Sequence, residues 1–347
     1  MLARAFCALG IVFSQPAWPQ AESAALTSLA AYPGADREQR LLEGARKEGE
    51  VVLYTSLTIE DMAAINGAFE KRYGIKVRMW RASADKVLQR ALAEGRAGRV
   101  EADVFEANAL PLESLHREAL LLAVRSPLHR DLIPQALPAH REWVASRLNV
   151  FVQAYNTRLV KKDELPRSFA DLADARWKGR LAIEAGDEEW FAAVVKELGE
   201  REGLALFRAI VAANGISVRK GHTLLTNLVA SGEVPLALTV YNFTAEQLMQ
   251  KGAPLEWFVL APAVARANGV GVSRRAPHPH AALLYYDFMI GEQAQRILAG
   301  RGFVPTSRKL ETPLQRLPLK LVDAAEMLDQ SAQWTRLFEE VVLRKNR

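Results

Sequence analysis

Polar and charged side chains follow each of three apolar runs in the first third of the sequence. The runs cover residues 51–54, 75–80 and 102–105, and they have the length and the β-branched or aromatic content of buried strands. A hydroxyl, guanidinium or carboxylate at the end of such a strand can hydrogen-bond or pair with a small charged solute. Each side chain alone is more typical of a helix cap or a loop. Their recurrence at successive strand ends makes them candidate ligand contacts: Thr55, Ser56, Arg81, Ser83, Glu106 and Asn108.

A second set of candidates lies later in the chain, near the starts of predicted helices. Gly186 and Asp187 open one helix, and a helix start exposes unpaired N–H groups that commonly receive an anion. Here carboxylates occupy that position, either as ordinary caps of the helix or as partners for a cationic group of a ligand. The remaining members of the set are Glu184, Trp190, Lys220, Tyr241 and Asn242.

The same inventory argues against catalysis. Cys7 is the only cysteine and lies in the predicted leader, so the mature chain has no thiol nucleophile, disulfide or thiolate metal site. The sequence has no Gly-x-Ser-x-Gly motif, and none of its six histidines has zinc-like spacing to another. We therefore expect a binding protein without a resident cofactor, and an enzyme on the same fold is a further alternative.

These candidates need a framework that brings strand ends together. From residue 50 onward, short apolar runs alternate with amphipathic helical segments. In the first such segment, Met62, Ile65 and Phe69 share one helical face, and Thr58 with Asp61 forms a capping pattern at its start. Strands that alternate with helices indicate parallel βαβ units, whose ligands bind at the carboxyl ends of the strands. The pattern therefore predicts an α/β fold.

Length and composition allow one large hydrophobic core or two of medium size. The chain has 347 residues, half of them hydrophobic, and a formal net charge of +5. Lysine and arginine are interspersed with acidic residues, and no basic block or basic-aromatic motif occurs, so nucleic acid is not an expected partner. A transcription regulator on a similar fold is also disfavoured, because we find no helix-turn-helix for reading DNA.

Residues 1–24 have the features of a secretory signal peptide. Arg4 gives a positive start, residues 5–13 are apolar, and Pro16 and Pro19 follow among small residues. No other stretch is long enough and apolar enough to span a membrane. We therefore expect a periplasmic protein, exported and cleaved near residues 20–25, that acts as a monomer.

The most specific sequence pattern lies at residues 143–158. An apolar run at 150–152 is closed by Tyr155-Asn156-Thr157-Arg158. The stretch resembles the hinge crossing of the ferric-ion-binding periplasmic proteins. Other stretches resemble this family in the same order: residues 176–183, the position of an adjacent tyrosine pair at 241–242, a late helix from residue 279, and a turn at 302–305.

The resemblance implies a two-lobed type II periplasmic binding protein, or Venus flytrap, with a mixed sheet flanked by helices in each lobe and hinge strands between the lobes. It assigns residues 25–149 and about 261–310 to lobe 1, and 150–260 to lobe 2. It assigns residues 311–347 to C-terminal helices that pack across lobe 2 and the hinge. The implied function is that of the substrate-binding component of an ABC transporter, which closes around a small solute and delivers it to a permease in the inner membrane.

The family's iron ligands are mostly missing. Ferric-binding members hold the metal with a histidine, a glutamate and two adjacent tyrosines, and only one of these four residue types is retained at the matching positions here: Thr58, Asn108, Tyr241 and Asn242. Ferric iron prefers several anionic oxygens. An iron or other metal site built on Tyr241 is therefore an alternative if carboxylates replace the lost ligands: Glu106, Glu184 and Asp187.

The candidate site as a whole carries both signs of charge. Arg81 and Lys220 are cationic, and three carboxylates oppose them. Their positions at strand ends and in loops also bring three aromatic residues to the expected site: Tyr54, Trp190 and Tyr241. Buried charges need partners, and a ligand that bears both signs can supply them. The expected ligand is therefore a small polar or charged organic solute, or a metal chelate.

Overall fold

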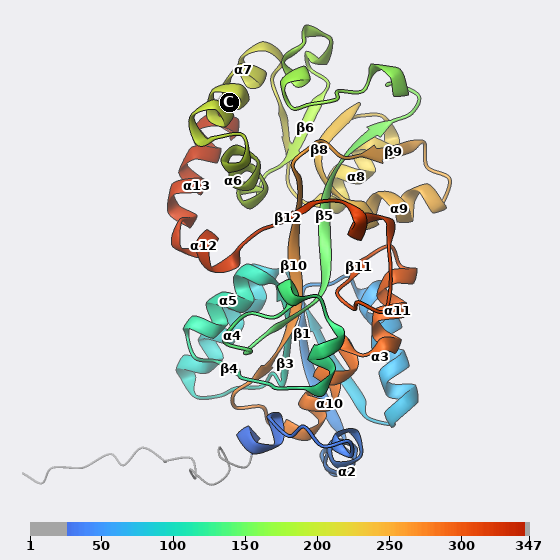
Figure 1. The fold of residues 1–347 in the computed structure, drawn as a ribbon, viewed down its shortest axis with the longest axis vertical. Coiled ribbons are helices and arrows are strands. Elements are labelled where there is room, and N and C mark those ends of the chain that lie inside the picture. The colour runs from blue at the N-terminus through green and yellow to red at the C-terminus, as the bar shows by residue number, and fades with distance from the viewer. Residues whose placement is uncertain (1–25, 344–347) are drawn as a thin grey trace, which may run out of the picture.

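The computed structural model describes residues 26–343, and the predicted signal peptide lies outside them. Two lobes are joined by two long strands, β5 (Val144–Asn156) and β10 (Ala263–Ser273), which run from one lobe into the other (Figure 1). The strand order is β2-β1-β3-β10-β5-β8-β6-β7, so these two strands lie at the centre of the whole arrangement. The predicted two-lobed α/β architecture is thus confirmed.

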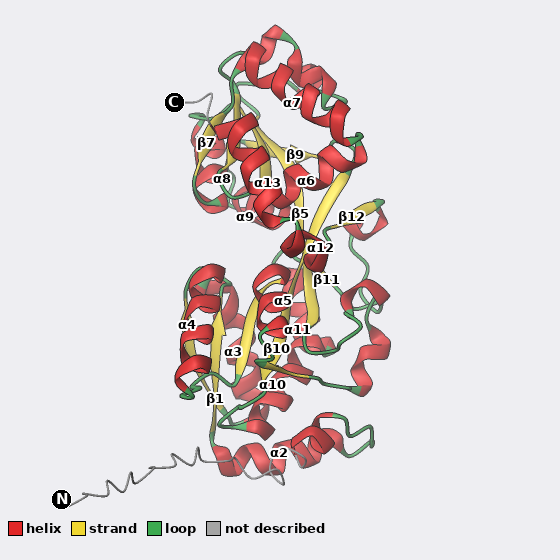
Figure 2. Cartoon of the chain, turned by 90° about the vertical axis from the view of Figure 1, so that its left-hand side faces the viewer, coloured by secondary structure: helices red, strands yellow, loops and turns green. Residues whose placement is uncertain are grey.

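The first lobe is a mixed sheet between helices (Figure 2). Strand β1 pairs in parallel with β2 and β3, and β10 then pairs antiparallel with β3. The strands are β1 (Glu50–Thr55), β2 (Lys76–Arg81), β3 (Val104–Asn108), β4 (Leu121–Leu122) and β11 (Val304–Pro305). The helices are α2 (Arg37–Glu48), α3 (Ile59–Tyr73), α4 (Ala84–Ala97), α5 (Ala109–Arg117), α10 (Pro279–Ile290) and α11 (Glu292–Gly300).

Local sequence signals explain where the first-lobe helices begin and end. The Thr58 hydroxyl caps α3 by accepting a hydrogen bond from the Asp61 N–H at 3.1 Å, as the capping pattern predicts. The helix ends at Gly74, whose φ of 72° is the left-handed conformation that glycine adopts without steric cost. Helix α10 is buried from Ala281 to Ile290, so its continuous apolar run is the central helix of this lobe.

The second lobe repeats the plan around β5. Strand β6 pairs in parallel with β7 and β8, whereas β8 and β9 pair antiparallel with β5. Its strands are β6 (Leu181–Glu184), β7 (Ser217–Arg219), β8 (Leu236–Tyr241) and β9 (Leu255–Phe258). Its helices are α6 (Glu188–Glu197), α7 (Glu200–Asn214), α8 (His222–Ser231) and α9 (Asn242–Gln250). Short 3₁₀ turns along the chain are Pro127–Asp131, Pro134–Ala136, Lys162–Glu164, Ala170–Ala173, Ala175–Trp177 and Pro313–Arg316.

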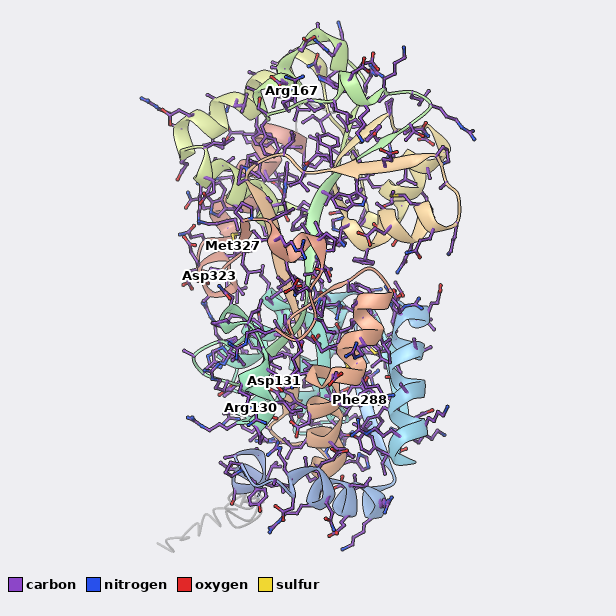
Figure 3. The ribbon with its side chains drawn as sticks, turned by 45° about the vertical axis from the view of Figure 1, so that its right-hand side comes forward. Arg130, Asp131, Arg167, Phe288, Asp323 and Met327 are labelled. Atoms are coloured by element: carbon purple, nitrogen blue, oxygen red, sulfur yellow. The ribbon has the colours of Figure 1, made fainter. Side chains whose placement is uncertain are left out.

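The C-terminal segment connects the lobes a third time. Strand β12 (Leu319–Leu321) pairs with β10, and α12 (Ala324–Asp329) follows, capped by Asp323 (Figure 3). Asp329 of α12 pairs with Arg117 of the first lobe at 2.6 Å, and Glu326 pairs with Lys196 of the second lobe at 2.7 Å. Helix α13 (Ser331–Phe338) and a π-helical turn at Glu339–Leu343 complete the described chain. None of the described helices is long and apolar enough to cross a membrane.

Candidate functional site

Four side chains meet at the carboxyl ends of the parallel strands β6 and β8. Glu184 ends β6, Asp187 precedes α6, His222 begins α8 and Tyr241 ends β8. Parallel strands place their carboxyl ends at the same sheet edge, so the loops that follow them share one surface. With Glu189 from the first turn of α6, we call these five residues the second-lobe cluster.

The second-lobe cluster is compact. One ligand atom each from Glu184, Asp187 and His222 lie within 4.8 Å of one another. Nε2 of His222 lies 3.2 Å from Oδ1 of Asp187, and the His222 ring centroid lies 3.9 Å from that of Tyr241. Phe151 of the hinge strand β5 packs on the same tyrosine at 5.2 Å. The cluster therefore combines carboxylates with an aromatic wall.

Glu184 is held by the backbone of two loops. Its carboxylate accepts N–H hydrogen bonds from Gly186 at 2.6 Å and from Gly221 at 2.7 Å. Gly221 is the residue before α8, so the positive end of that helix also lies beside the carboxylate. Glu184 thus fixes the shape of the site and has its charge partly compensated by the protein.

Asp187 is not compensated in this way. Its exposed fraction is 0%, its side chain makes no capping hydrogen bond to α6, and neither carboxylate oxygen has a hydrogen-bond partner. The Tyr241 hydroxyl is also buried without a hydrogen-bond partner. Burial raises the pKa of Tyr241 well above its usual value, with Arg266 opposing this and the nearby carboxylates adding to it. The phenol is therefore protonated at neutral pH in the ligand-free protein.

A second group of polar residues lies on one face of the hinge strands. In the pairing of β10 with β5, Arg266 lies opposite Asn149, and Asn268 lies opposite Arg147. In the pairing of β10 with β3, Asn268 also lies opposite Asn108. Opposed residues and residues two apart on a strand share a face. We call this surface the hinge face, and with Glu106, two residues before Asn108, it comprises Glu106, Asn108, Arg147, Asn149, Arg266 and Asn268.

Ion pairs connect and neutralise the hinge face. Glu106 and Arg147 are both buried and lie 2.7 Å apart. Arg266 pairs with Glu189 of the second-lobe cluster, and its guanidinium lies 5.0 Å from the centroid of the Tyr241 ring. Burial lowers the pKa of Arg266, but Tyr241 and the neighbouring carboxylates more than reverse this, so Arg266 stays charged. The hinge face and the second-lobe cluster thus form one continuous site.

Polar groups without partners gather at this site. Within residues 26–343, seventeen buried side-chain nitrogen and oxygen atoms lack a hydrogen-bond partner. Twelve of them belong to the hinge face or the second-lobe cluster. Because native proteins satisfy nearly all buried polar groups, this concentration makes the region a candidate ligand site.

The structure places the other predicted contacts in different surroundings. Thr55 donates its hydroxyl hydrogen to Glu106 at 2.5 Å, so it orients that carboxylate. The backbone N–H of Ser56 donates to the Glu106 carbonyl at 3.0 Å, and Asn108 lies on the hinge face. Thr58, at one of the iron-ligand positions of the resembling family, is committed to the cap of α3. The structure places three other predicted contacts at exposed positions: Arg81, Ser83 and Lys220.

Three predicted aromatic and amide contacts are buried and packed or hydrogen-bonded within the protein. The Trp190 ring is buried in the second-lobe core, with ring centroids 5.8 Å from Phe169 and 5.9 Å from Phe207. Tyr54 belongs to the first-lobe core, and its hydroxyl donates to Glu94 at 2.6 Å. Asn242 is also fully buried, and both ends of its amide are used within the protein: it donates to the Gly302 carbonyl at 2.8 Å and accepts from the Val150 N–H at 3.4 Å.

Several residues of the site were not among the sequence candidates. The hinge-strand members show a period-two signal, because Arg147 and Asn149 interrupt one apolar strand and Arg266 and Asn268 interrupt another. Polar residues that share one face of an otherwise buried strand are a recognisable sign of a functional surface. The two further members, Glu189 and His222, carry no such sequence signal.

Comparison with known proteins agrees with this architecture. The chain is 27% identical to iron uptake protein A1 of Synechocystis sp. over 274 residues, which are 74% of this chain and 75% of that protein. It is 26% identical to the Fe(3+)-binding periplasmic protein of Serratia marcescens over 306 residues, covering 82% and 88% of the two chains.

Solved structures share the fold. Iron-bound HitA from Pseudomonas aeruginosa superposes with a TM-score of 0.73 at 24% identity, covering 84% of this chain and 99% of that one. AfuA from Actinobacillus pleuropneumoniae, with exogenous fructose-6-phosphate bound, gives a TM-score of 0.74 at 22% identity, covering 85% and 99%. Proteins with this fold thus hold chemically different ligands.

The family described as "Bacterial extracellular solute-binding protein" matches residues 127–328, more than half of the chain, including both hinge strands and the second-lobe cluster. The chain therefore belongs to the bacterial extracellular solute-binding proteins.

Proposed function

We propose that this protein is the periplasmic substrate-binding component of an ABC importer and that its solute carries a cationic group. The solute binds between the hinge face and the second-lobe cluster. The lobes then close by bending of β5 and β10, and the closed complex is recognised by a permease in the inner membrane. Contacts from both lobes favour the closed state because only that state makes all of them at once.

The observation that carries this proposal is the buried, uncompensated carboxylate of Asp187. Opposite charges neutralise each other within each of two ion pairs, Glu106–Arg147 and Glu189–Arg266. The Glu184 carboxylate is stabilised by two backbone N–H groups. Asp187 has only the imidazole of His222 at ion-pair distance among the described residues. An uncompensated buried charge is costly, so the site favours a ligand that brings a positive charge to this carboxylate.

A thermal-shift screen of residues 25–347 tests the proposal. The protein is unfolded and refolded to remove any carried-over ligand, and the panel holds amines, amino-carboxylates, carboxylates, phosphonates and metal ions. A ligand that binds only the native state raises its apparent stability with the logarithm of its excess over Kd. We expect shifts from cationic compounds that Asp187→Asn removes.

The matched control is Glu233→Gln, which neutralises an exposed carboxylate of the same lobe, 3.5 Å from Arg219. This control keeps the shift. Stabilisation by carboxylates or phosphonates alone, undiminished in Asp187→Asn, would contradict the proposal.

Ferric iron is a second candidate cargo. The ligand atoms of Glu184, Asp187 and His222 converge within 4.8 Å, and the unpartnered Tyr241 hydroxyl stands beside the His222 ring. Carboxylate and phenolate oxygens suit a hard cation, and the relatives described above are named for iron uptake or Fe(3+) binding. This set replaces the tyrosine pair of the resembling family, since Asn242 is committed elsewhere.

Iron has its own test. Ferric citrate added to the ligand-free protein would give a visible tyrosinate-to-iron charge-transfer band, and Tyr241→Phe would abolish it. The same addition to Tyr155→Phe serves as a control, because the Tyr155 hydroxyl donates to Glu256 outside the second-lobe cluster. Absence of the band with the wild-type protein would exclude a tyrosinate-bound ferric cargo.

The other site predictions stay part of this proposal. Thr55, Ser56 and Asn108 would support the hinge face, and the exposed side chains of Arg81, Ser83 and Lys220 would reach the solute only on lobe closure. We also keep lobe boundaries at 25–149 with about 261–310, at 150–260, and at 311–347 for the C-terminal segment. Export by a cleaved signal peptide, a monomeric state and the absence of catalysis complete the proposal.

A further inference from the structure

The buried polar atoms without hydrogen-bond partners differ between the two parts of the site: most on the hinge strands are donors, and the charged ones in the second-lobe cluster are acceptors. On the hinge strands β5 and β10, most are N–H donors: Nε of Arg147, Nε of Arg266 and Nδ2 of Asn268. Nη1 of Arg147 is not free, because it lies 2.7 Å from Oε1 of Glu106 in an ion pair. In the second-lobe cluster, the charged ones are carboxylate oxygens: both of Asp187 and Oε2 of Glu189. The exceptions on the hinge face are the uncharged amide oxygens of Asn108 and Asn149, and Oε1 of Glu106, whose charge is neutralised by Arg147. A ligand that satisfies both sides must be an acceptor toward the hinge and a donor toward Asp187.

Arg266 is only partly used by the protein. Glu189 engages Nη1, while Nε is buried without a hydrogen-bond partner, and the side chain is 16% exposed. A planar guanidinium has five N–H donors and binds carboxylates through two parallel hydrogen bonds. One edge of Arg266 therefore remains for a carboxylate of the ligand.

Asn268 and Arg147 extend this donor surface. Arg266 and Asn268 are two residues apart on β10, roughly 7 Å along the strand, and their side chains share a face. Arg147 lies opposite Asn268 on β5 and is 1% exposed. Its pairing with Glu106 leaves Nε without a hydrogen-bond partner. The donors thus converge from two strands on the same side of the hinge.

The donor surface and Asp187 are close together. The guanidinium of Arg266 lies 5.0 Å from the Tyr241 ring centroid, and the His222 ring lies 3.9 Å from the same ring. Nε2 of His222 is in turn 3.2 Å from Asp187. The anion-binding group and the cation-binding group therefore lie against the same pair of aromatic rings, and Asp187 is one of the charges that raise the pKa of Arg266.

Resting on the function proposed above, we infer that the solute is a compact amino-carboxylate. Its carboxylate binds the free edge of Arg266 with support from Asn268, and its ammonium group binds Asp187 beside the rings of Tyr241 and His222. A simple amine would leave the hinge-face donors without acceptors. A phosphate dianion would add negative charge beside three carboxylates: Glu184, Asp187 and Glu189.

Matched pairs of small molecules test the inference by isothermal titration. Each amino-carboxylate is compared with the amine that lacks only its carboxylate: glycine with methylamine, β-alanine with ethylamine, 4-aminobutyrate with propylamine, and lysine with 1,5-diaminopentane. We expect at least one amino-carboxylate to bind about ten- to a hundred-fold more tightly than its amine, the range of a charged hydrogen-bonded contact. The chain length of the tightest pair then measures the separation of the two charges.

Variants assign each end of the solute. Arg266→Met should bring the amino-carboxylate down to the affinity of its amine and leave the amine unchanged, whereas Asp187→Asn should weaken both. Because Arg266→Met leaves Glu189 without its partner, the double variant Arg266→Met/Glu189→Gln is measured alongside it. Arg219→Met, which removes an arginine 3.5 Å from Glu233 in the same lobe, is the control and keeps the wild-type preference.

The outcomes separate this inference from the proposed function. Equal affinity within every pair, or a preference that survives Arg266→Met in both backgrounds, overturns the inference while amine binding still supports a cationic solute. Binding of no amine, amino-carboxylate or ferric citrate overturns both.

Discussion

The Asp187 carboxylate lies 3.2 Å from Nε2 of His222, and this imidazole is the one cationic or potentially cationic side chain at ion-pair distance among the described residues. The pair is unusual in its surroundings, because the carboxylate is fully buried and neither oxygen has a hydrogen-bond partner. We therefore expect Asp187 to destabilise the ligand-free protein, a cost that a bound cationic ligand would offset. Binding sites often hold such groups at a cost in stability.

Asp187→Asn should consequently separate binding from stability. Neutralising the buried carboxylate removes an uncompensated charge, so the melting temperature of the ligand-free protein should stay equal or rise. Affinity for the cationic solute should fall by about 1.5–3 kcal/mol, the usual contribution of a hydrogen bond to a charged group. Calorimetric titration and thermal unfolding of the same sample measure both. A lower melting temperature would mean that Asp187 is structural.

Tyr241→Phe should weaken ligand binding with little effect on the ligand-free protein. The hydroxyl has no hydrogen-bond partner, so its removal relieves a buried polar group while the ring contacts with His222 and Phe151 remain. Urea unfolding of the ligand-free variant should give a midpoint close to that of the wild type. A large loss of stability would show that the hydroxyl has a partner within the protein.

Asn242→Ala should instead lower the stability of the ligand-free protein. Its amide links α9 to the turn at Gly302 and to the β5 backbone at Val150, and its loss would leave two buried backbone groups without partners. The expected destabilisation is about 1–3 kcal/mol, independent of ligand. Urea unfolding with and without saturating ligand measures it. An unchanged urea midpoint combined with loss of ligand binding would show that Asn242 contacts the ligand.

His129 predicts one pH dependence of stability. Burial is the main cause that lowers its pKa from 6.5 to about 4, and its ring nitrogen lies 2.8 Å from the Tyr286 hydroxyl. Because the folded pKa is below the unfolded one, this contribution to stability is complete above pH 6.5 and is lost as the pH falls toward 4. His129→Gln should flatten the decline in urea midpoint over that interval. An equally steep decline in the variant would assign it to other groups.

Part of the candidate site could be predicted from the sequence, because the residues that end a strand are determined by local chain order. Glu184 and Tyr241 each end a strand, and parallel pairing of β6 with β8 is sufficient to bring them together. The alternation of apolar runs and helices likewise predicted the α/β class, whereas the two lobes followed from the family resemblance. Both signals are contained in short windows of sequence.

The hinge face depends instead on register between distant segments. Arg147 and Asn268 oppose each other only because β5 pairs with β10 in one particular alignment, more than a hundred residues apart in sequence. A shift of one residue would move either side chain to the other face of the sheet. Trp190 shows the corresponding difficulty on a helix. Glu189 and Trp190 are neighbours in sequence but lie about 100° apart around α6, so one reaches Arg266 and the other enters the core.

The bridges between the lobes also bear on how a solute would reach the site. Helix α12 spans one margin of the junction through Arg117 and Lys196, and α9 spans another through the hydrogen bond from Asn242 to Gly302 (Figure 1). We expect a solute to enter between these two margins, so that their spacing sets the size of the compounds that can reach the charged groups.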